Sequence, residues 1–395
     1  MSTLSAGECD GCPRDAPINC VNRVDRPILP ADGMIPHMTE RNGDPPADPP
    51  AAGRPTLRQV AAHAGVSIKT ASRALRGEGY VAPATAARVQ DAARAVGFRL
   101  NAMASELRRG GTSTLVGLVT GDLANPFYSR VAGGMERELR TSGLQLVTAS
   151  TDEDPAVERA LIDALLQRRV QALLIVSASA DHAHLADEAG RGVPLVFVDR
   201  PPRGVQADTV LIDNVAGASS AIAHLVAHGH RRIGVVADLS RLATQQARLD
   251  GVTAAMTAAG ITDWHRWFRQ DAHDVAAAEA AVTDLLSGPQ PPTALFTLNN
   301  RITAGALRSL QQEPPGTVHR SAAVSADHRP PALIGFDDFE FSDVLGVSVV
   351  GYDAEKMGRA AARLALDRMG GATPPARTVV IETRLVARGS GERRL

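Results

Sequence analysis

The chain of 395 residues has few aromatic side chains, little cysteine and no long apolar run. Its 8 Phe, 2 Trp and 3 Tyr leave Ala, Leu and Val to build the cores, so stacking platforms for sugars or bases must be sparse. All three cysteines fall within the first twenty residues, so the rest of the sequence can form no disulfide. The apolar stretches are strand-sized, far below the ~18 residues that span a bilayer. Residues 1–40 also lack the apolar core of a secretory signal, so we expect a cytoplasmic protein without a membrane span.

The formal net charge of −1 conceals an uneven distribution along the chain. Residues 1–53 carry four Arg against eight acidic side chains, and residues 54–113 carry ten basic against three acidic side chains. The remaining 282 residues carry 28 basic against 32 acidic side chains. A segment with a net charge of +7 therefore lies between two segments of −4, and such asymmetry indicates a nucleic-acid partner for the basic segment.

The first segment has the composition of a tail outside any fold. Residues 1–53 contain nine Pro and five Gly and show no sustained hydrophobic period, which predicts a disordered tail or a start assigned upstream of the true one. Cys9, Cys12 and Cys20 could indicate metal or redox chemistry, but three thiols without a nearby fourth ligand favour an inert tail.

From residue 114 onward, short apolar runs alternate with longer helical patterns. This alternation is typical of parallel, doubly wound α/β sheets, and about 280 residues favour two subdomains over one sheet. A polar connection at 311–331 with four prolines predicts a surface loop insertion. The expected strands are 115–119, 144–149, 172–177, 194–198, 209–212, 233–237, 294–298 and 332–336. The expected helices are 127–141, 155–167, 215–227, 243–258, 274–286, 302–310 and 354–369.

The basic segment predicts three short helices. Thr56 should cap the first helix, Gly65 should end it in the left-handed conformation, and Ser67 should cap a second helix at 68–76. A third helix is expected to follow Pro83. Two short helices joined by a three-residue turn with Gly form the helix-turn-helix unit, whose second helix enters the major groove. A helical hairpin with no nucleic-acid role is the alternative, which the charge of +7 disfavours.

Several motifs extend this pattern through most of the chain. Residues 56–73 read Thr-Leu-Arg-Gln-Val-Ala-x-x-Ala-Gly-Val-Ser-x-x-Thr-x-Ser-Arg. Later motifs are Asn101-Ala-x-Ala104, Asn125-Pro-Phe-Tyr128, Val198-Asp-Arg200, Arg248-x-x-Gly251 and Gly335-Phe-Asp-Asp338. Together they resemble the LacI/GalR (lactose-repressor) family of bacterial regulators over roughly residues 56–390.

The resemblance implies a domain organisation and a class of function. It implies a helix-turn-helix head at 54–100, a hinge helix and linker at 101–113, and an effector-binding and dimerisation domain at 114–395. The last would be a periplasmic-binding-protein-like sensor of two doubly wound α/β subdomains. The implied partners are double-stranded operator DNA, a small-molecule effector of carbohydrate type, and further copies of the chain in a homodimer or tetramer. The effector could either release DNA or promote its binding.

The family implies three sets of DNA-contacting residues in the head and hinge. At the start of the second helix, basic side chains can donate to guanine and an aliphatic one can contact a thymine methyl; these candidates are Ile68, Lys69 and Arg73. Hydroxyl groups suit phosphate contacts; these candidates are Thr56, Ser67, Thr70 and Ser72. In the hinge, which begins at Asn101, Leu107 would wedge into a minor-groove step, the alternative being that it is only linker.

A second candidate site follows the expected strands of the α/β part. Ligands of open α/β sheets bind outside the carboxyl ends of the strands, and two such subdomains make a cleft. By resemblance, Arg248 matches an arginine that clamps sugar hydroxyls or a carboxylate, and Asn300 stands where many relatives carry a ligand-bonding aspartate. Phe127 and Tyr352 are candidates for an apolar wall or for core. The effector-binding candidates are Asn125, Phe127, Arg200, Arg248, Asn300, Asp337 and Tyr352.

Catalysis and metal binding have little support in the sequence. His224, His228 and His230 have the spacing of metal ligands, but Gly229 indicates a helix C-terminus, where cationic side chains are favoured anyway. Nucleophile-elbow, phosphate-loop and dinucleotide fingerprints are absent, so neither an enzyme nor a cofactor is expected. A solute-binding protein of a transport system would need a signal peptide and no basic head. We therefore expect a ligand-responsive transcriptional repressor.

Overall fold

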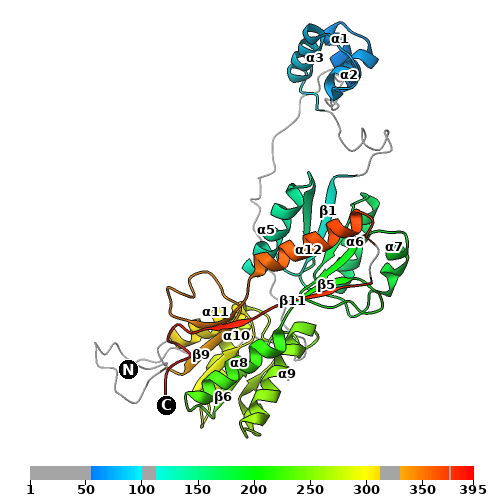
Figure 1. Cartoon of the computed structure of the whole chain (residues 1–395). Coiled ribbons are helices and arrows are strands. Elements are labelled where there is room, and N and C mark those ends of the chain that lie inside the picture. Colours follow the sequence, from blue (N-terminus) through cyan, green and yellow to red (C-terminus); the bar gives the residue numbers. More distant parts are fainter. Residues whose placement is uncertain (1–54, 100–112, 312–329, 373–374) are drawn as a thin grey trace, which may run out of the picture. The chain divides into compact units, whose positions relative to one another are not determined.

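The computed structural model describes residues 55–99, 113–311, 330–372 and 375–395. The chain divides into two compact units, 1–99 and 100–395, each of which is treated by itself (Figure 1). The described part of the first unit is called the head, and that of the second is called the large unit. The predicted tail, nearly all of the predicted hinge and the predicted loop insertion lie outside the described residues.

The head consists of three helices, as the sequence predicts: α1 Leu57–Ala64, α2 Ile68–Arg76 and α3 Pro83–Ala95. Thr56 and Gln59 form a capping box at the start of α1, and Gly65 ends that helix with φ 64°. Ser67 caps α2 by accepting from the Thr70 N–H group at 3.1 Å. Small apolar side chains from all three helices form the core: Val60, Ala61, Ala64, Ala71, Ala74, Val89, Ala92 and Ala93.

The large unit contains two six-stranded sheets with equivalent strand orders. One sheet has the order β11-β5-β4-β3-β1-β2, and the other has the order β12-β10-β9-β8-β6-β7. The strands of the first are β1 Leu115–Thr120, β2 Gln145–Ser150, β3 Leu173–Ile175, β4 Leu195–Val198, β5 Asp208–Ile212 and β11 Thr378–Ile381. The strands of the second are β6 Ile233–Val236, β7 Phe268–Arg269, β8 Ala294–Thr297, β9 Ala332–Phe336, β10 Ser348–Gly351 and β12 Arg384–Val386.

Helices cover both faces of each sheet, which makes two three-layer subdomains. On the first sheet, α5 and α12 pack on one face and α6 on the other; on the second, α8 with α9 and α10 with α11 take opposite faces. The α-helices are α5 Pro126–Arg140, α6 Pro155–Gln167, α7 Ala186–Gly190, α8 Asn214–Ala227, α9 Ala243–Ala258, α10 Val275–Ser287, α11 Asn300–Gln311 and α12 Ala354–Met369. The 3-10 helices are η1 Ala183–Leu185 and η2 Trp264–Trp267.

The expected strands and helices are confirmed to within a few residues, and the prediction of two doubly wound subdomains is confirmed. Two details differ. The sequence reading missed β7, β10, β11, β12 and the short α7. One edge strand also departs from the parallel order, because β12 runs antiparallel to β10. An antiparallel edge strand is common on otherwise parallel sheets, since it needs no crossover helix.

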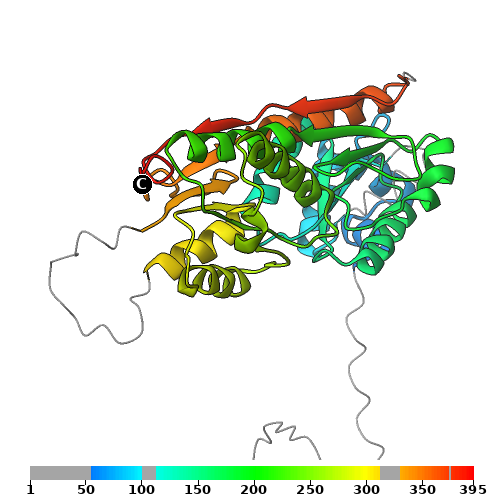
Figure 2. The same ribbon diagram turned by 90° about the horizontal axis from the view of Figure 1, so that it is seen from below.

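The chain passes between the two subdomains three times: from β5 to α8, from β10 to α12, and from β11 to β12. Figure 2 shows the last of these passages as the red C-terminal strands that run along one edge of both sheets. The carboxyl ends of the central strands of both sheets therefore meet between the subdomains. This arrangement places the loops after β1, β4, β8 and β9 around one cavity.

Candidate functional site

The head presents the side chains at the start of α2 to solvent. Ile68 is 46% exposed although it is a large aliphatic residue, and Lys69 and Arg73 on the same helix are also exposed. The opposite side of α2 is held in the core by Ala71 and Ala74. The three residues predicted to face base edges therefore share an accessible surface with a basic character.

The predicted phosphate-contacting residues of the head lie at helix starts or beside them. Thr56 and Ser67 are exposed N-caps, so their hydroxyl groups already bond within their helices. The Thr70 hydroxyl lies 2.9 Å from that of Ser67, and Ser72 is half-buried. Asn101 and Leu107, the hinge candidates, lie outside the described residues.

A polar cavity, here called the central cavity, lies between the two subdomains of the large unit. It brings together residues that are far apart in the sequence. Of the predicted residues, its lining includes Asn125, Phe127, Arg200, Arg248, Asp337 and Tyr352. Asn300 lines the adjoining outer cavity, which shares Phe127, Asp337 and Tyr352 with the central one. Phe127 and Tyr352 pack against the core and also line the cavity.

A buried ion pair forms one wall of the central cavity. Arg200 donates from Nη1 to Glu153 Oε2 at 2.5 Å and from Nη2 to Oε1 at 2.8 Å. The same guanidinium donates to the Tyr128 hydroxyl at 3.0 Å and to the Ser177 carbonyl at 2.6 Å. Arg200 is only 5% exposed; burial lowers its pKa, but the neighbouring Tyr128 and Glu153 outweigh burial and hold the pKa above the usual range. Planar bidentate pairing of this kind fixes an arginine rigidly.

Arg248 organises the opposite wall. Its Nε donates to Asn214 Oδ1 at 2.8 Å, one Nη donates to the Leu298 carbonyl, and the other lies 3.4 Å from Asp337 Oδ1. The guanidinium carbon also sits 3.7 Å from the centre of the Phe336 ring, within cation–π range. Arg248 is 4% exposed, so its charge is held in place by partners from several elements.

Two aspartates occupy equivalent positions in the two subdomains. Asp199 follows β4 with φ 70° and Asp337 follows β9 with φ 75°, a region that non-glycine residues rarely adopt. Each donates its N–H group to the neighbouring strand, Asp199 to Val210 at 2.8 Å and Asp337 to Val350 at 3.0 Å. The two-sheet architecture thus aims a carboxylate into the cavity from each side.

The two carboxylates differ in the number of hydrogen bonds that they accept. Asp337 accepts from the Tyr352 hydroxyl at 2.8 Å and from the Asn300 N–H group at 3.2 Å. The buried Oδ1 atom of Asp199 has no hydrogen-bond partner among the described residues. Burial raises the pKa of Asp199 to about 6, although Arg200 opposes the shift.

Direct bonds join the two subdomains across the cavity. The Asn300 side chain donates to Asn125 Oδ1 at 2.8 Å, and Arg301 donates to Asp122 at 2.6 Å. A ligand group that enters here would compete with these bonds. These two bonds tie one subdomain to the other at the cavity.

The sequence reading missed several residues of the central cavity. Asp238 lies two residues after the end of β6, and Glu153 lies in the loop after β2, so a search of the carboxyl ends of the strands would have found both. Tyr128 stands beside the predicted Phe127 and bonds to Arg200. His273 lies far from any predicted strand end, and its contact with Asp238 at 2.7 Å, which raises its pKa, has no signal in the sequence.

The histidines with metal-like spacing have other partners. His224 lies 2.7 Å from Glu392, and His228 contacts the His224 carbonyl at 2.8 Å. His230 contacts Thr293 and the Arg393 carbonyl. Within the described ranges, groupings of three or more His, Cys, Asp or Glu side chains that could hold a metal ion are not found. Nor, in the described part of the chain, is any helix both long and apolar enough to cross a membrane.

Two family models match the chain. Residues 56–101 match the model of bacterial regulatory proteins of the lacI family. Residues 113–362 match the model of periplasmic binding proteins and the sugar-binding domain of the LacI family.

Similar proteins agree with these matches along most of the chain. The transcriptional regulator PtxS of Pseudomonas plecoglossicida is 31% identical over 343 residues, which cover 85% of this chain and 96% of that protein. The regulator CelR of Thermobifida fusca is 32% identical and covers 86% of this chain and 98% of its own length. A solved complex of CelR with cellobiose is 30% identical, with a TM-score of 0.60 over 85% of this chain and all of that one. The lac repressor dimer bound to operator, at 22% identity and a TM-score of 0.68, is similar in fold.

Proposed function

Because the chain belongs to the LacI family of bacterial transcriptional regulators, we propose a division of labour between its two units. The head reads an operator sequence, and the large unit binds a small-molecule effector of carbohydrate type between its subdomains. The observation that carries this proposal is the buried polar set at the carboxyl ends of both sheets, in which Arg248 and the paired aspartates face one cavity. The proteins named above are regulators, and that class requires no catalytic group.

In the head, base edges are read by Ile68, Lys69 and Arg73. Their exposure on one side of α2 supports this role, because a helix in the major groove reads bases with its first turns. Thr56, Ser67, Thr70 and Ser72 fix the register through phosphate contacts, for which exposed helix N-termini are suited. Asn101 opens the hinge, and Leu107 wedges into a minor-groove step.

In the large unit, the effector hydroxyl groups bond to Arg248, Asp337, Asn125 and Asn300. Phe127 and Tyr352 supply the apolar wall, and Arg200 closes the far side through its pair with Glu153. The effector replaces the Asn125–Asn300 bond, so ligand binding and the angle between subdomains are coupled. A coupling of about 1–3 kcal/mol is typical of such regulators.

The regulator acts as a homodimer. Two heads suit a near-palindromic operator, because a two-fold protein needs two-fold DNA. Support comes from one loop of the large unit, where Phe341 is 61%, Val344 77% and Leu345 53% exposed. Phe341 also has φ 68°, so the backbone holds an aromatic ring outward at some cost. A second copy of the chain would bury these side chains.

The test is an electrophoretic mobility shift with DNA from upstream of neighbouring genes, with and without candidate sugars. We expect a sequence-selective, salt-sensitive shift whose strength changes with one sugar class. The absence of a selective shift under every condition would refute the proposal. A thermal-shift screen of the same sugars identifies the effector, because a ligand of the native state raises Tm.

A variant of the hinge separates the two units functionally. We expect Leu107→Ala to weaken operator binding and to leave effector affinity unchanged, since the wedge contacts only DNA. Operator affinity is measured by mobility shift and effector affinity by calorimetry. Unchanged operator affinity would show that Leu107 is only linker.

A further inference from the structure

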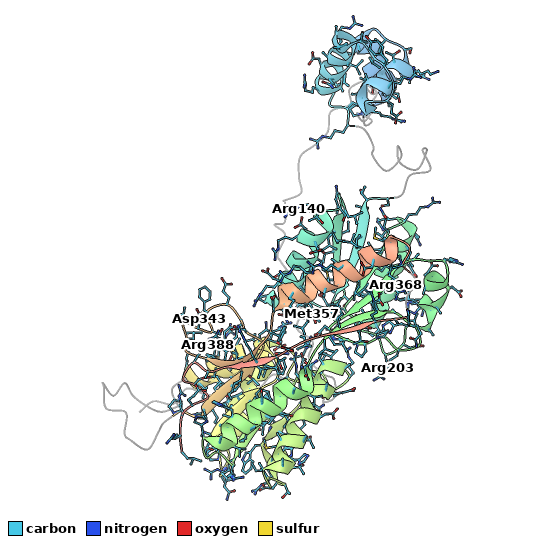
Figure 3. All side chains as sticks on the ribbon, viewed as in Figure 1. Arg140, Arg203, Asp343, Met357, Arg368 and Arg388 are labelled. Atoms are coloured by element: carbon cyan, nitrogen blue, oxygen red, sulfur yellow. The ribbon has the colours of Figure 1, made fainter. Side chains whose placement is uncertain are left out.

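A second cavity, of about 130 Å³, adjoins the central cavity between the subdomains. It shares Arg200 and Leu242 with the central cavity and is here called the mouth cavity. One side is formed by residues 177–180 and 200–203, and the other by the start of α9. Figure 3 shows Arg203 on the side of its subdomain that faces α8 and α9.

The two cavities have opposite charge. The central cavity is lined by five carboxylates against three arginines: Asp122, Glu153, Asp199, Asp238 and Asp337 against Arg200, Arg248 and Arg301. The mouth cavity is lined by Arg200, Arg203 and Arg241, and its lining contains no acidic side chain. A ligand that spans both cavities would meet hydrogen-bond acceptors in the central cavity and positive charge in the mouth cavity.

The arginines of the central cavity are already engaged with carboxylates. Arg200 pairs with Glu153, Arg301 with Asp122 at 2.6 Å, and Arg248 faces Asp337. An anionic group placed there would meet neutralised cations and surplus carboxylates. The central cavity therefore suits hydroxyl groups rather than a phosphate or carboxylate.

The arginines particular to the mouth cavity are not neutralised. Arg241 donates across the cleft to the Glu153 carbonyl at 2.7 Å and to the Ala178 carbonyl at 3.3 Å, which are uncharged partners. Neither Arg241 nor Arg203 has a carboxylate oxygen within 4 Å among the described residues. Both guanidinium groups keep their full charge beside the cavity.

One further feature of the mouth cavity suits an anion. The helix α9 starts at its edge without a side-chain cap and without an acidic residue in its first turn. Its leading N–H groups and the positive end of its dipole are therefore available to an anion.

We propose that the mouth cavity is an anion subsite, and that the effector is a sugar carrying a phosphate or carboxylate group that Arg203 and Arg241 bind. This inference rests on the proposed effector site and specifies its ligand class. The polyol part lies in the central cavity, and the anion replaces the backbone carbonyls as the partner of Arg241. The subsite draws on both subdomains, so the anion stabilises the closed form.

The first test uses inorganic phosphate as the probe and the full chain as the protein. Tm is followed during phosphate titration against chloride of equal ionic strength, for the wild type, Arg203→Gln/Arg241→Gln and the control Arg308→Gln. Arg308 is an exposed arginine of α11, outside this cavity. We expect the double variant to bind phosphate at least about tenfold more weakly, because two charge-assisted donors are lost, and the control to match the wild type. An equal response of the double variant and the wild type would overturn the proposal.

The second test compares glucose, glucose 6-phosphate and gluconate, and likewise fructose and fructose 1-phosphate, by thermal shift. We expect an anionic member to raise Tm more than its neutral partner, in the wild type only. A neutral sugar that binds as well as its anionic partners would overturn the proposal, and the identity of the stronger anion separates phosphate from carboxylate. If none of these sugars shifts Tm, the phosphate titration alone decides. Operator mobility shifts with the same preparations report separately on the regulator function.

Discussion

The head and the large unit hold their functional side chains in opposite ways. In the head, Ile68, Lys69 and Arg73 project into solvent from one short helix and take no part in the core. In the large unit, Arg200, Arg248 and their carboxylate partners are buried and bonded to one another. The proposed DNA-reading surface can thus change without disturbing its fold, whereas the proposed effector site is part of what stabilises its unit. Three substitutions test this contrast.

The largest effect is expected from Arg248→Ala. Removing the guanidinium leaves the Leu298 carbonyl and Asn214 Oδ1 without their donor and Asp337 without its cation. Breaking a buried pair in this way costs about 3–5 kcal/mol. We expect urea unfolding of the large unit to shift accordingly and effector binding to be lost. A destabilisation no larger than that of the exposed control Arg308→Ala would contradict the idea that the site supports the fold.

The next effect is a pH dependence that originates at Asp199. Its folded-state pKa of about 6 lies above the ordinary value of 3.8. Between these two pH values, the folded state therefore keeps a proton on Asp199 that the unfolded state has already released. The Asp199 contribution therefore favours folding at low pH and is lost as pH rises from about 4 to 6, by about 3 kcal/mol. We expect Asp199→Asn to be more stable than the wild type at pH 7 and to lose this advantage near pH 4.

The measurement is the difference in unfolding free energy between Asp199→Asn and the wild type at several pH values, which cancels the titration of all other groups. Asp152, an exposed aspartate with φ 50°, offers the control substitution Asp152→Asn. A difference in unfolding free energy that stays constant from pH 4 to pH 7 would show that burial does not raise the pKa of Asp199.

Of the three substitutions, Arg73→Ala is expected to change stability least. It should nevertheless clearly weaken DNA binding. Loss of a base-edge donor should weaken operator binding by about 1–3 kcal/mol and relax specificity at one base pair. The stability of the head should change by less than about 0.5 kcal/mol, because the side chain is exposed. Arg94→Ala on α3, where Arg94 is exposed and pairs with Asp91, is the matched control. Equal losses of operator affinity in both variants would indicate a purely electrostatic role.

The sequence predicted the head almost completely, because all of its signals are local. The caps Thr56 and Ser67, the glycine turn and the spacing of small apolar residues all act within a few positions. In the large unit, strand–helix alternation was sufficient to predict most elements. It missed β7, which has two residues, and the C-terminal strands β11 and β12, which pair with β5 and β10 and not with each other.

Only part of the proposed effector site could be predicted from the sequence. Arg248, Asp337 and Asn125 follow recognisable motifs or strand ends, and all of them line the central cavity. The pairing of Arg200 with Glu153, and the unbonded Oδ1 atom of Asp199 beside it, could not be predicted. Neither depends on spacing in the sequence, because Glu153 after β2 and Arg200 after β4 bond to each other although β1 and β3 lie between the two strands in the sheet.

The sequence by itself determined the helices of the head, the α/β class of the large unit and the basic character of the DNA-reading surface. These follow from periodicity, capping and charge, which act over short distances along the chain. Tertiary structure alone decided which charges face one another, and hence that an acidic central cavity lies beside a cationic mouth. The physical reason is that the energy of a buried charge depends on its distance to partners in space, and the folding of two sheets against each other sets those distances.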